Sequence, residues 1–154
     1  MKFYIDPGRG GRDPGAVNGA HPEKTDALCM GLALRDEMQR RGYTVAMTRI
    51  GDTCPSFSER ANFANGSGAD VYISLHRNSA TAAAATCIEV LYRSQSDKTA
   101  ANNTASMKLA VELDKRGVAA MSYRDRDAMV QHKYKCYFIC QVILPFCCSA
   151  TTAF

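Results

Sequence analysis

Short apolar runs and amphipathic stretches alternate along the chain. The apolar runs have the length and composition of buried strands, and the stretches between them carry apolar residues at helical spacing. The strands that this pattern predicts are residues 2–5, 43–47, 71–75 and 88–92. The helices that it predicts are residues 23–41, 56–65 and about 99 to 116. The alternation favours one α/β domain over residues 1–154, with a twisted, mostly parallel or mixed sheet of about five to six strands flanked by helices.

Two of the predicted helices carry clear local signals. On the first helix, one face gathers apolar residues at helical spacing, namely Ala27, Met30, Leu34 and Met38. Gly42 follows this helix and is expected to end it. The second helix is expected to begin with Ser56 as its N-cap, because Glu59 stands three residues later and completes a capping box.

The longest apolar stretch, Cys136–Cys148, is interrupted by Gln141 and Pro145. It is shorter than the roughly 20 residues that cross a bilayer, so we expect one or two buried strands there and no membrane span. At the other end, a strand follows Met1 and Lys2 directly, which leaves no room for a secretion signal. We therefore expect a chain that is cytoplasmic as synthesised.

The composition is that of an ordinary globular protein, with 46% hydrophobic and 22% charged residues. The net charge of +4 suits an anionic polymer as a partner, but the positive charges do not gather into the stripe of a nucleic-acid reader. The seven cysteines are an odd number and include no CxxC pair, so we expect reduced, mostly buried thiols. We expect a monomer that does not bind nucleic acid.

The loop from Asp6 to Pro22 is rich in glycine and proline. It is too long for a simple connection, which indicates a functional segment. Asp6, Arg49 and His76 each follow a predicted strand, and ligands of α/β folds gather at the carboxyl ends of strands. We expect these three residues to converge on one edge of the sheet.

Five sequence blocks then point to a known family. In order, they read I-D-P-G-R-G-G-R-D-P-G-A, E-K, G-Y-T-V-A-M-T-R, E-R-A-N-F-A-N and A-D-V-Y-I-S-L-H-R-N-S. Over residues 2–79 the chain resembles the zinc-dependent N-acetylmuramoyl-L-alanine amidases, which are cell-wall hydrolases. The resemblance is weaker as far as about residue 126 and poor over residues 127–154.

The resemblance implies an activity and a set of site residues. It implies hydrolysis of the amide bond between N-acetylmuramic acid and L-alanine in peptidoglycan, with Zn²⁺ as cofactor. It assigns metal-ligand roles to Glu23 and His76, and it places Arg9 at the position of the third ligand. Three nitrogen or oxygen ligands and one open water position are the usual set for a hydrolytic zinc.

Two positions depart from the pattern of that family. Arg9 stands where the family has a histidine, and a guanidinium offers only donors, so it cannot coordinate a cation. The family's late catalytic glutamate is not found, and the apolar segment that should carry it has Gln141. A base lost at that position typically removes a factor of about 10²–10⁴ in rate. The catalytic residue is therefore unassigned.

Alternatives remain open for the residues around this site. Arg9 is either a surface arginine of the turn or a guanidinium that takes the place of the cation and pairs with Glu23 in a bidentate manner. A replacement third ligand would have to come from His21, His132 or Cys136. Asp6 either supports a metal ligand or belongs to the ordinary chemistry of the turn. Arg49 and Arg60 either contact the substrate or form ion pairs. Asn78 is expected to fix the loop that follows His76.

Three functions are compatible with these observations. The first is a peptidoglycan amidase that reaches the cell wall after export or lysis. The second is a non-catalytic module that keeps the wall-binding cleft, and the third is a decayed remnant that does not fold cooperatively. Zinc content, release of stem peptide and binding to insoluble peptidoglycan discriminate among the three.

Overall fold

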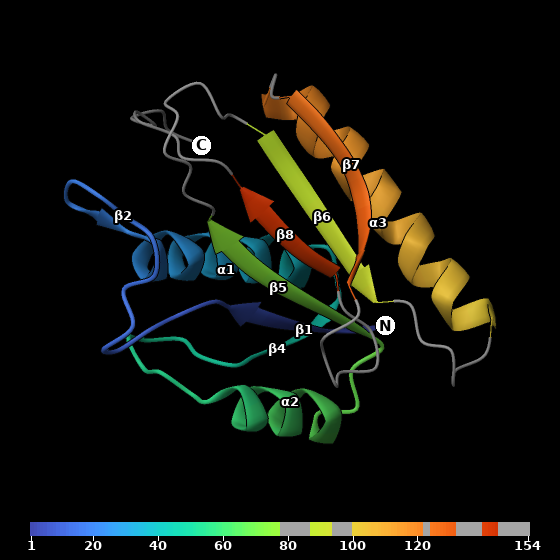
Figure 1. The fold of residues 1–154 in the computed structure, drawn as a ribbon. Coiled ribbons are helices and arrows are strands. Elements are labelled where there is room, and N and C mark those ends of the chain that lie inside the picture. The colour runs from blue at the N-terminus through green and yellow to red at the C-terminus, as the bar shows by residue number, and fades with distance from the viewer. Residues whose placement is uncertain (78–86, 94–99, 122–123, 132–139, 145–154) are drawn as a thin grey trace.

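A computed structural model describes residues 1–77, 87–93, 100–121, 124–131 and 140–144 (Figure 1). Its main feature is a six-stranded sheet with the strand order β4-β1-β5-β8-β6-β7. The strands are β1 (Lys2–Pro7), β4 (Thr44–Met47), β5 (Val71–Arg77), β6 (Cys87–Arg93), β7 (Arg124–Gln131) and β8 (Cys140–Leu144).

The sheet is mixed, and most of its pairings are parallel. β1 runs parallel to both β4 and β5, β5 runs parallel to β8, and β6 runs parallel to β7. Only β6 and β8 pair in antiparallel fashion among these strands. The predicted fold class is therefore confirmed. The predicted strands 2–5, 71–75 and 88–92 lie within β1, β5 and β6, and the predicted strand 43–47 is β4, which begins one residue later.

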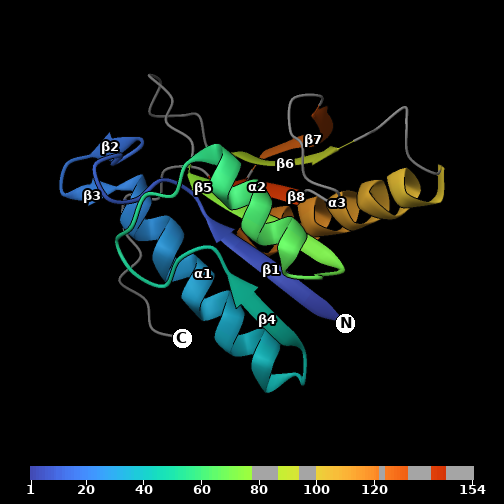
Figure 2. The same cartoon turned by 90° about the horizontal axis from the view of Figure 1, so that it is seen from below.

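Within the residues that the structure describes, three helices accompany the sheet, as the sequence predicted. They are α1 (Glu23–Arg40), α2 (Phe57–Gly66) and α3 (Ala100–Met121), which is longer at its end than expected. Figure 2 shows α1 and α2 on either side of the strands β1 and β5. The third helix, α3, packs against β6 and β7.

Alternate residues of the central strands face the two helices. Phe3, Ile5, Ile73 and Leu75 form the buried core on the α1 side, and they pack against the apolar face of α1, namely Met30, Leu34 and Met38. The opposite face of β1 carries Asp6, whose carboxylate is bonded to Arg60 of α2. One face of these strands is thus an apolar core and the other presents polar groups.

The local signals of the two first helices are confirmed. Ala27 is fully buried on the apolar face of α1, and the chain turns at Gly42 with a φ of 84°. The side chain of Ser56 accepts a hydrogen bond from the Glu59 amide, and the Glu59 carboxylate accepts one from the Ser56 amide. This capping box fixes the N-terminus of α2.

The sequence analysis missed two pieces of secondary structure. The long loop contains a small hairpin of β2 (Val17–Asn18) and β3 (His21–Pro22), and β7 forms one edge of the sheet. The expectation of mostly buried thiols is wrong for the two cysteines whose side chains are described, because Cys29 and Cys54 are free and exposed. Within the described residues, no helix has both the length and the apolar composition needed to cross a membrane.

Candidate functional site

The turn that follows β1 is held by two buried arginines. Arg49 donates hydrogen bonds to the carbonyl oxygens of Pro7 and Gly8 at 3.0 and 2.8 Å. Arg60 donates to the carbonyl oxygens of Pro7 and Arg9 at 3.0 and 2.7 Å. Hydrogen bonds that involve a charged group are stronger than neutral ones, so these contacts fix the path of the backbone through the turn.

Arg49 holds backbone rather than side chains among the described residues. Its side chain is buried, with 3% of the residue exposed, and its other hydrogen bonds go to the carbonyl oxygens of Lys24 and Gly51. Burial, and then the charge of Arg60, lower the pKa of Arg49. Among the described residues Arg49 has no ion pair within 4 Å, and its hydrogen bonds tie the first loop to the loop after β4.

Asp6 and Arg60 form an ion pair beneath the site. Arg60 Nη1 lies 2.5 Å from Asp6 Oδ1, and both side chains are more than nine-tenths buried. Asp6 Oδ2 accepts a hydrogen bond from the Tyr72 hydroxyl at 2.5 Å. The ion-pair alternative for Arg60 is confirmed. The Asp6 carboxylate is bonded to Arg60, Tyr72 and Ser74, and it reaches the residue at the first ligand position only through Arg60, which donates to the Arg9 carbonyl oxygen.

Glu23, at the start of α1, lies at the centre of the site and is 1% exposed. Its Oε1 accepts a hydrogen bond from His76 Nδ1 at 2.8 Å, and its Oε2 accepts one from Arg9 Nε at 3.1 Å. The Ala16 and Arg77 amides also donate to this carboxylate, at 2.9 and 3.4 Å. The structure thus brings Arg9, Glu23 and His76 together, from three separate elements.

The surroundings of Glu23 stabilise its charged form. Burial raises the pKa of Glu23, but the hydrogen bonds from His76 and Ala16, with the charges of His76 and Arg9, lower it to about 2. The carboxylate is therefore ionised at neutral pH, and Arg9 is its permanent counter-ion. The expected pairing of Arg9 with Glu23 is confirmed, although it is not bidentate, because Arg9 Nη1 points to Asp13 at 3.4 Å.

Two glycines make room for these side chains. A Cβ at Gly8 would lie 2.3 Å from Cε1 of His76, and a Cβ at Gly15 would lie 2.3 Å from Oε2 of Glu23. Gly15 also has a φ of 65°, a conformation that favours glycine. The glycine-rich composition of the loop therefore follows from the close approach of its backbone to the site.

The donor set around Glu23 does not fit a zinc ion. A guanidinium cannot coordinate, and Arg9 contributes a positive charge at one oxygen of Glu23 while His76 occupies the other. In the part of the chain that the structure describes, no group of three His, Cys, Asp or Glu side chains could hold a metal. His21 lies in β3 and is exposed, and its carbonyl oxygen accepts a hydrogen bond from Arg77.

A pocket of about 310 Å³ opens above these residues. Arg9 and His76 form part of its wall, and Phe57 at the start of α2 forms another part, with 79% of the residue exposed. The other lining residues are Asp6, Gly8, Asp13, Cys54, Pro55, Ser56, Arg60, Tyr72 and Ser74. Concave sites that combine apolar walls with a few polar groups are typical of ligand pockets.

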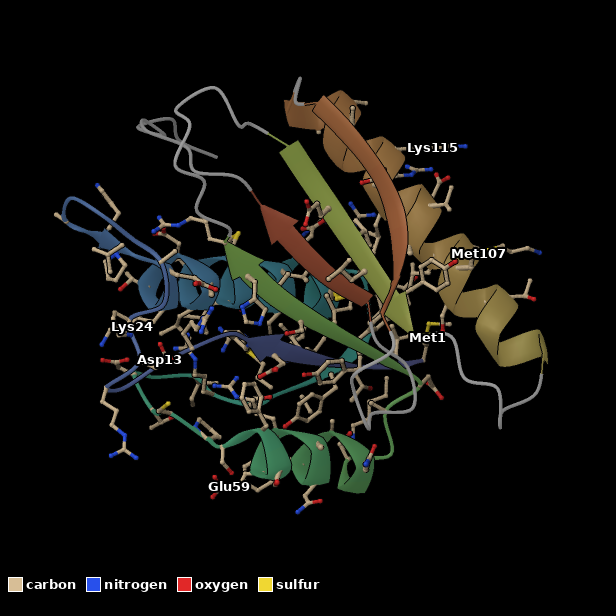
Figure 3. All side chains as sticks on the ribbon, in the orientation of Figure 1. Met1, Asp13, Lys24, Glu59, Met107 and Lys115 are labelled. Atoms are coloured by element: carbon tan, nitrogen blue, oxygen red, sulfur yellow. The ribbon has the colours of Figure 1, made fainter. Side chains whose placement is uncertain are left out.

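The contacts of two residues that shape the site were not predicted from the sequence. Arg77 is buried, pairs with Asp26 of α1 and donates to the carbonyl oxygens of Ala16 and His21. Lys24 donates to Asp52 at 2.7 Å and to the Gly11 carbonyl oxygen at 2.8 Å. Figure 3 shows Lys24 and Asp13 at the same end of the molecule, beside the loop that follows β1. Alternation along β5 puts Arg77 on the same face as Ile73 and Leu75, toward α1, and this was the signal for its contact with Asp26.

Three of the predicted site residues lie outside the described residues, and a fourth, Gln141, is placed by its backbone pairing. Asn78, His132 and Cys136 lie outside the described residues. Gln141 lies in β8, where its backbone pairs in register with Ser74 of β5 and with Leu91 of β6. The expected roles of Asn78 and Gln141 therefore stay predictions.

Comparisons with known proteins agree with the resemblance in the sequence. A family model described as N-acetylmuramoyl-L-alanine amidase matches residues 3–142. The sporulation-specific N-acetylmuramoyl-L-alanine amidase of Bacillus subtilis (strain 168) is 42% identical over 81 residues, which are 51% of this chain and 32% of that protein. The amidase AmiA of Salmonella typhimurium is 32% identical over 134 residues, which are 82% of this chain and 44% of that protein.

A solved structure has the same fold. The crystal structure of the N-acetylmuramoyl-L-alanine amidase from Clostridium difficile 630 superimposes with a TM-score of 0.78 at 28% sequence identity, and covers 92% of this chain and 77% of that one. The chain spans between about a third and about half of the length of the two curated relatives named above.

Proposed function

This chain belongs to the N-acetylmuramoyl-L-alanine amidase family, and on that premise we propose that it recognises peptidoglycan at the bond between N-acetylmuramic acid and L-alanine. The relatives are named for their action at this bond. We place the domain at the bacterial cell wall, which it reaches after export or lysis, and we expect it to act as a monomer. The pocket above Arg9 and His76 is the place where the muramoyl-peptide would bind.

We further propose that this chain binds peptidoglycan but has lost most of its ability to hydrolyse it. One observation carries this proposal: Arg9, whose Nε lies 3.1 Å from Glu23 Oε2, lines an open pocket together with His76. The family is generally zinc-dependent, but a guanidinium at this point competes with a cation for the same carboxylate. Gln141 in place of a glutamate base would lower turnover further.

A zinc-dependent amidase is the second candidate. The 2.8 Å contact between Glu23 Oε1 and His76 Nδ1 favours it, because it keeps two family ligand positions side by side. This candidate requires Arg9 to leave Glu23 and a third ligand to come from elsewhere in the chain. The zinc ion would supply a Lewis acid and an activated water.

Sedimentation with purified, insoluble peptidoglycan tests the proposal. We expect the chain to sediment with the polymer in the presence of EDTA, to sediment less in high salt because its net charge is +4, and to gain nothing from added zinc. Release of stem peptide with one bound zinc per chain would favour the second candidate. A chain that neither binds the polymer nor unfolds cooperatively would be a decayed remnant, and the proposal would fail.

A further inference from the structure

The guanidinium of Arg9 contacts two carboxylates through two of its three nitrogens. Its Nε is bonded to Glu23, and its Nη1 makes a long contact of 3.4 Å with Asp13. The side chains of Arg9 and Asp13 are 41% and 44% exposed. Among the residues that the structure describes, the Nη2 group of Arg9 has no hydrogen-bond partner. A guanidinium carries five N–H donors, so this one keeps donors for a ligand.

The backbone of Arg9 supports the same conclusion. Its φ is 61°, and Arg9 is the only non-glycine residue with a positive φ in the described part of the chain. Residues in such conformations persist where the surroundings impose them, and they cluster at functional sites. The carbonyl oxygen of Arg9 accepts a hydrogen bond from Arg60 at 2.7 Å in this conformation. The turn thus holds Arg9 at the pocket in a sparsely populated conformation.

From these observations we propose that Arg9 is a metal-free receptor for a carboxylate on the peptide part of the ligand. This inference rests on the proposed function. Arg9 lines the pocket, and the planar fork of a guanidinium matches the two oxygens of a carboxylate. Glu23 is already saturated by its own donors, and the exposed carboxylate of Asp13 is the one that an incoming carboxylate would displace.

A purely structural role for Arg9 makes a different prediction. A counter-ion for Glu23 needs a positive charge near Oε2, which a lysine at position 9 would retain. A carboxylate receptor needs the fork of donors, which a lysine lacks. Arg9→Lys therefore separates the two roles, and Arg12→Gln is the matched control, because Arg12 is exposed, lies in the same loop and does not line the pocket.

The experiment measures the affinity of two soluble ligands by calorimetry in the presence of EDTA. The ligands are N-acetylmuramoyl-L-alanyl-glutamate, in which the alanine carboxyl is in a peptide bond as in the stem peptide and the second residue carries free carboxylates, and the same compound with these carboxylates converted to uncharged primary amides. We expect the unaltered chain and the Arg12→Gln variant to bind the carboxylate form at least tenfold more tightly than the amide. We expect Arg9→Gln and Arg9→Lys to bind the two forms within about twofold of each other, at the level of the amide. Thermal unfolding checks that each variant is folded.

Three results would overturn the inference. The first is equal affinity of the unaltered chain for both forms. The second is a full preference for the carboxylate form in Arg9→Lys. The third is binding of the chain to intact peptidoglycan without binding to either fragment. In each case the proposed function would survive, because binding to the polymer is measured separately. Loss of binding to the fragments and to the polymer together would instead refute the proposed function.

Discussion

Arg9 Nε donates a hydrogen bond to Glu23 Oε2 across 3.1 Å, so a fixed positive charge lies against the most buried carboxylate of the site. Glu23 Oε1 is bonded to His76 at the same time. We propose that this guanidinium takes the place of the zinc ion on which the family generally depends. The predictions below follow from this exchange and from the residues that support it.

The buried pair of Arg60 and Asp6 should be important for stability. Arg60→Met would leave the Asp6 carboxylate buried without its cation, and the turn would lose two carbonyl contacts. We expect the free energy of unfolding in urea to fall by about 3–5 kcal/mol. Arg40→Met is the control, because it removes an exposed pair with Glu37 and should change the free energy of unfolding by less than about 1 kcal/mol. Equal effects of the two substitutions would contradict this prediction.

The pKa of Glu23 should make stability depend on pH in the acid range. Its folded value of about 2 lies below the ordinary value of 4.5. The stabilisation is therefore complete above pH 4.5, and it is lost as the pH falls from there through about 2, with a total of about 3 kcal/mol. Titration of the Glu23 carboxyl carbon by NMR gives the pKa directly, and a midpoint near 4.5 would show that the contacts seen here do not persist in solution.

Gly8 should be essential for the geometry of the site. Gly8→Ala would place a methyl group 2.3 Å from the His76 ring, so the ring or the turn must move. We expect weaker binding to insoluble peptidoglycan and a loss of stability of about 1–3 kcal/mol. Gly66→Ala is the control, since nothing lies within 4 Å of its Cβ position and alanine favours a helix. An unchanged affinity in Gly8→Ala would argue against a role of His76 at the ligand site.

Arg9→His should restore metal binding more than it restores hydrolysis. The variant regains a third ligand beside Glu23 and His76, but it still has Gln141 at the position where we expect the family's base. Adding Gln141→Glu to Arg9→His should raise the rate of stem-peptide release by about 10²–10⁴. The release of stem peptide by the two variants, each loaded with zinc, gives this ratio. A similar rate for the single and double variants would mean that Gln141 does not occupy the position of the base.

The sequence was a good guide to the elements that bury an apolar face. The strands around Ile5 and Ile73 and the helix face of Leu34 were predictable, because local periodicity reports directly on burial. The strand β7 was missed because it begins with the charged run Arg124-Asp125-Arg126-Asp127, and a strand at the edge of a sheet tolerates charges that a central strand would not.

The candidate site was predictable in its members and less so in their contacts. The convergence of Asp6 and His76 follows from strand ends that share one edge of a sheet, whereas Glu23 joins them from the start of α1. The hydrogen bonds of Arg49 to backbone carbonyl oxygens connect residues about 40 positions apart, and no local sequence pattern predicts them. A buried arginine that binds backbone carbonyls looks, in a sequence, the same as one that faces substrate.

Zinc stoichiometry is the most direct test of the central claim, which is that Arg9 takes the place of the metal. The unaltered chain, Arg9→His and the control Arg12→His would each be incubated with zinc, dialysed and analysed by atomic absorption. Our account predicts far less than one zinc per chain for the unaltered protein and for Arg12→His, and close to one for Arg9→His. One tightly bound zinc per molecule of the unaltered chain would contradict it.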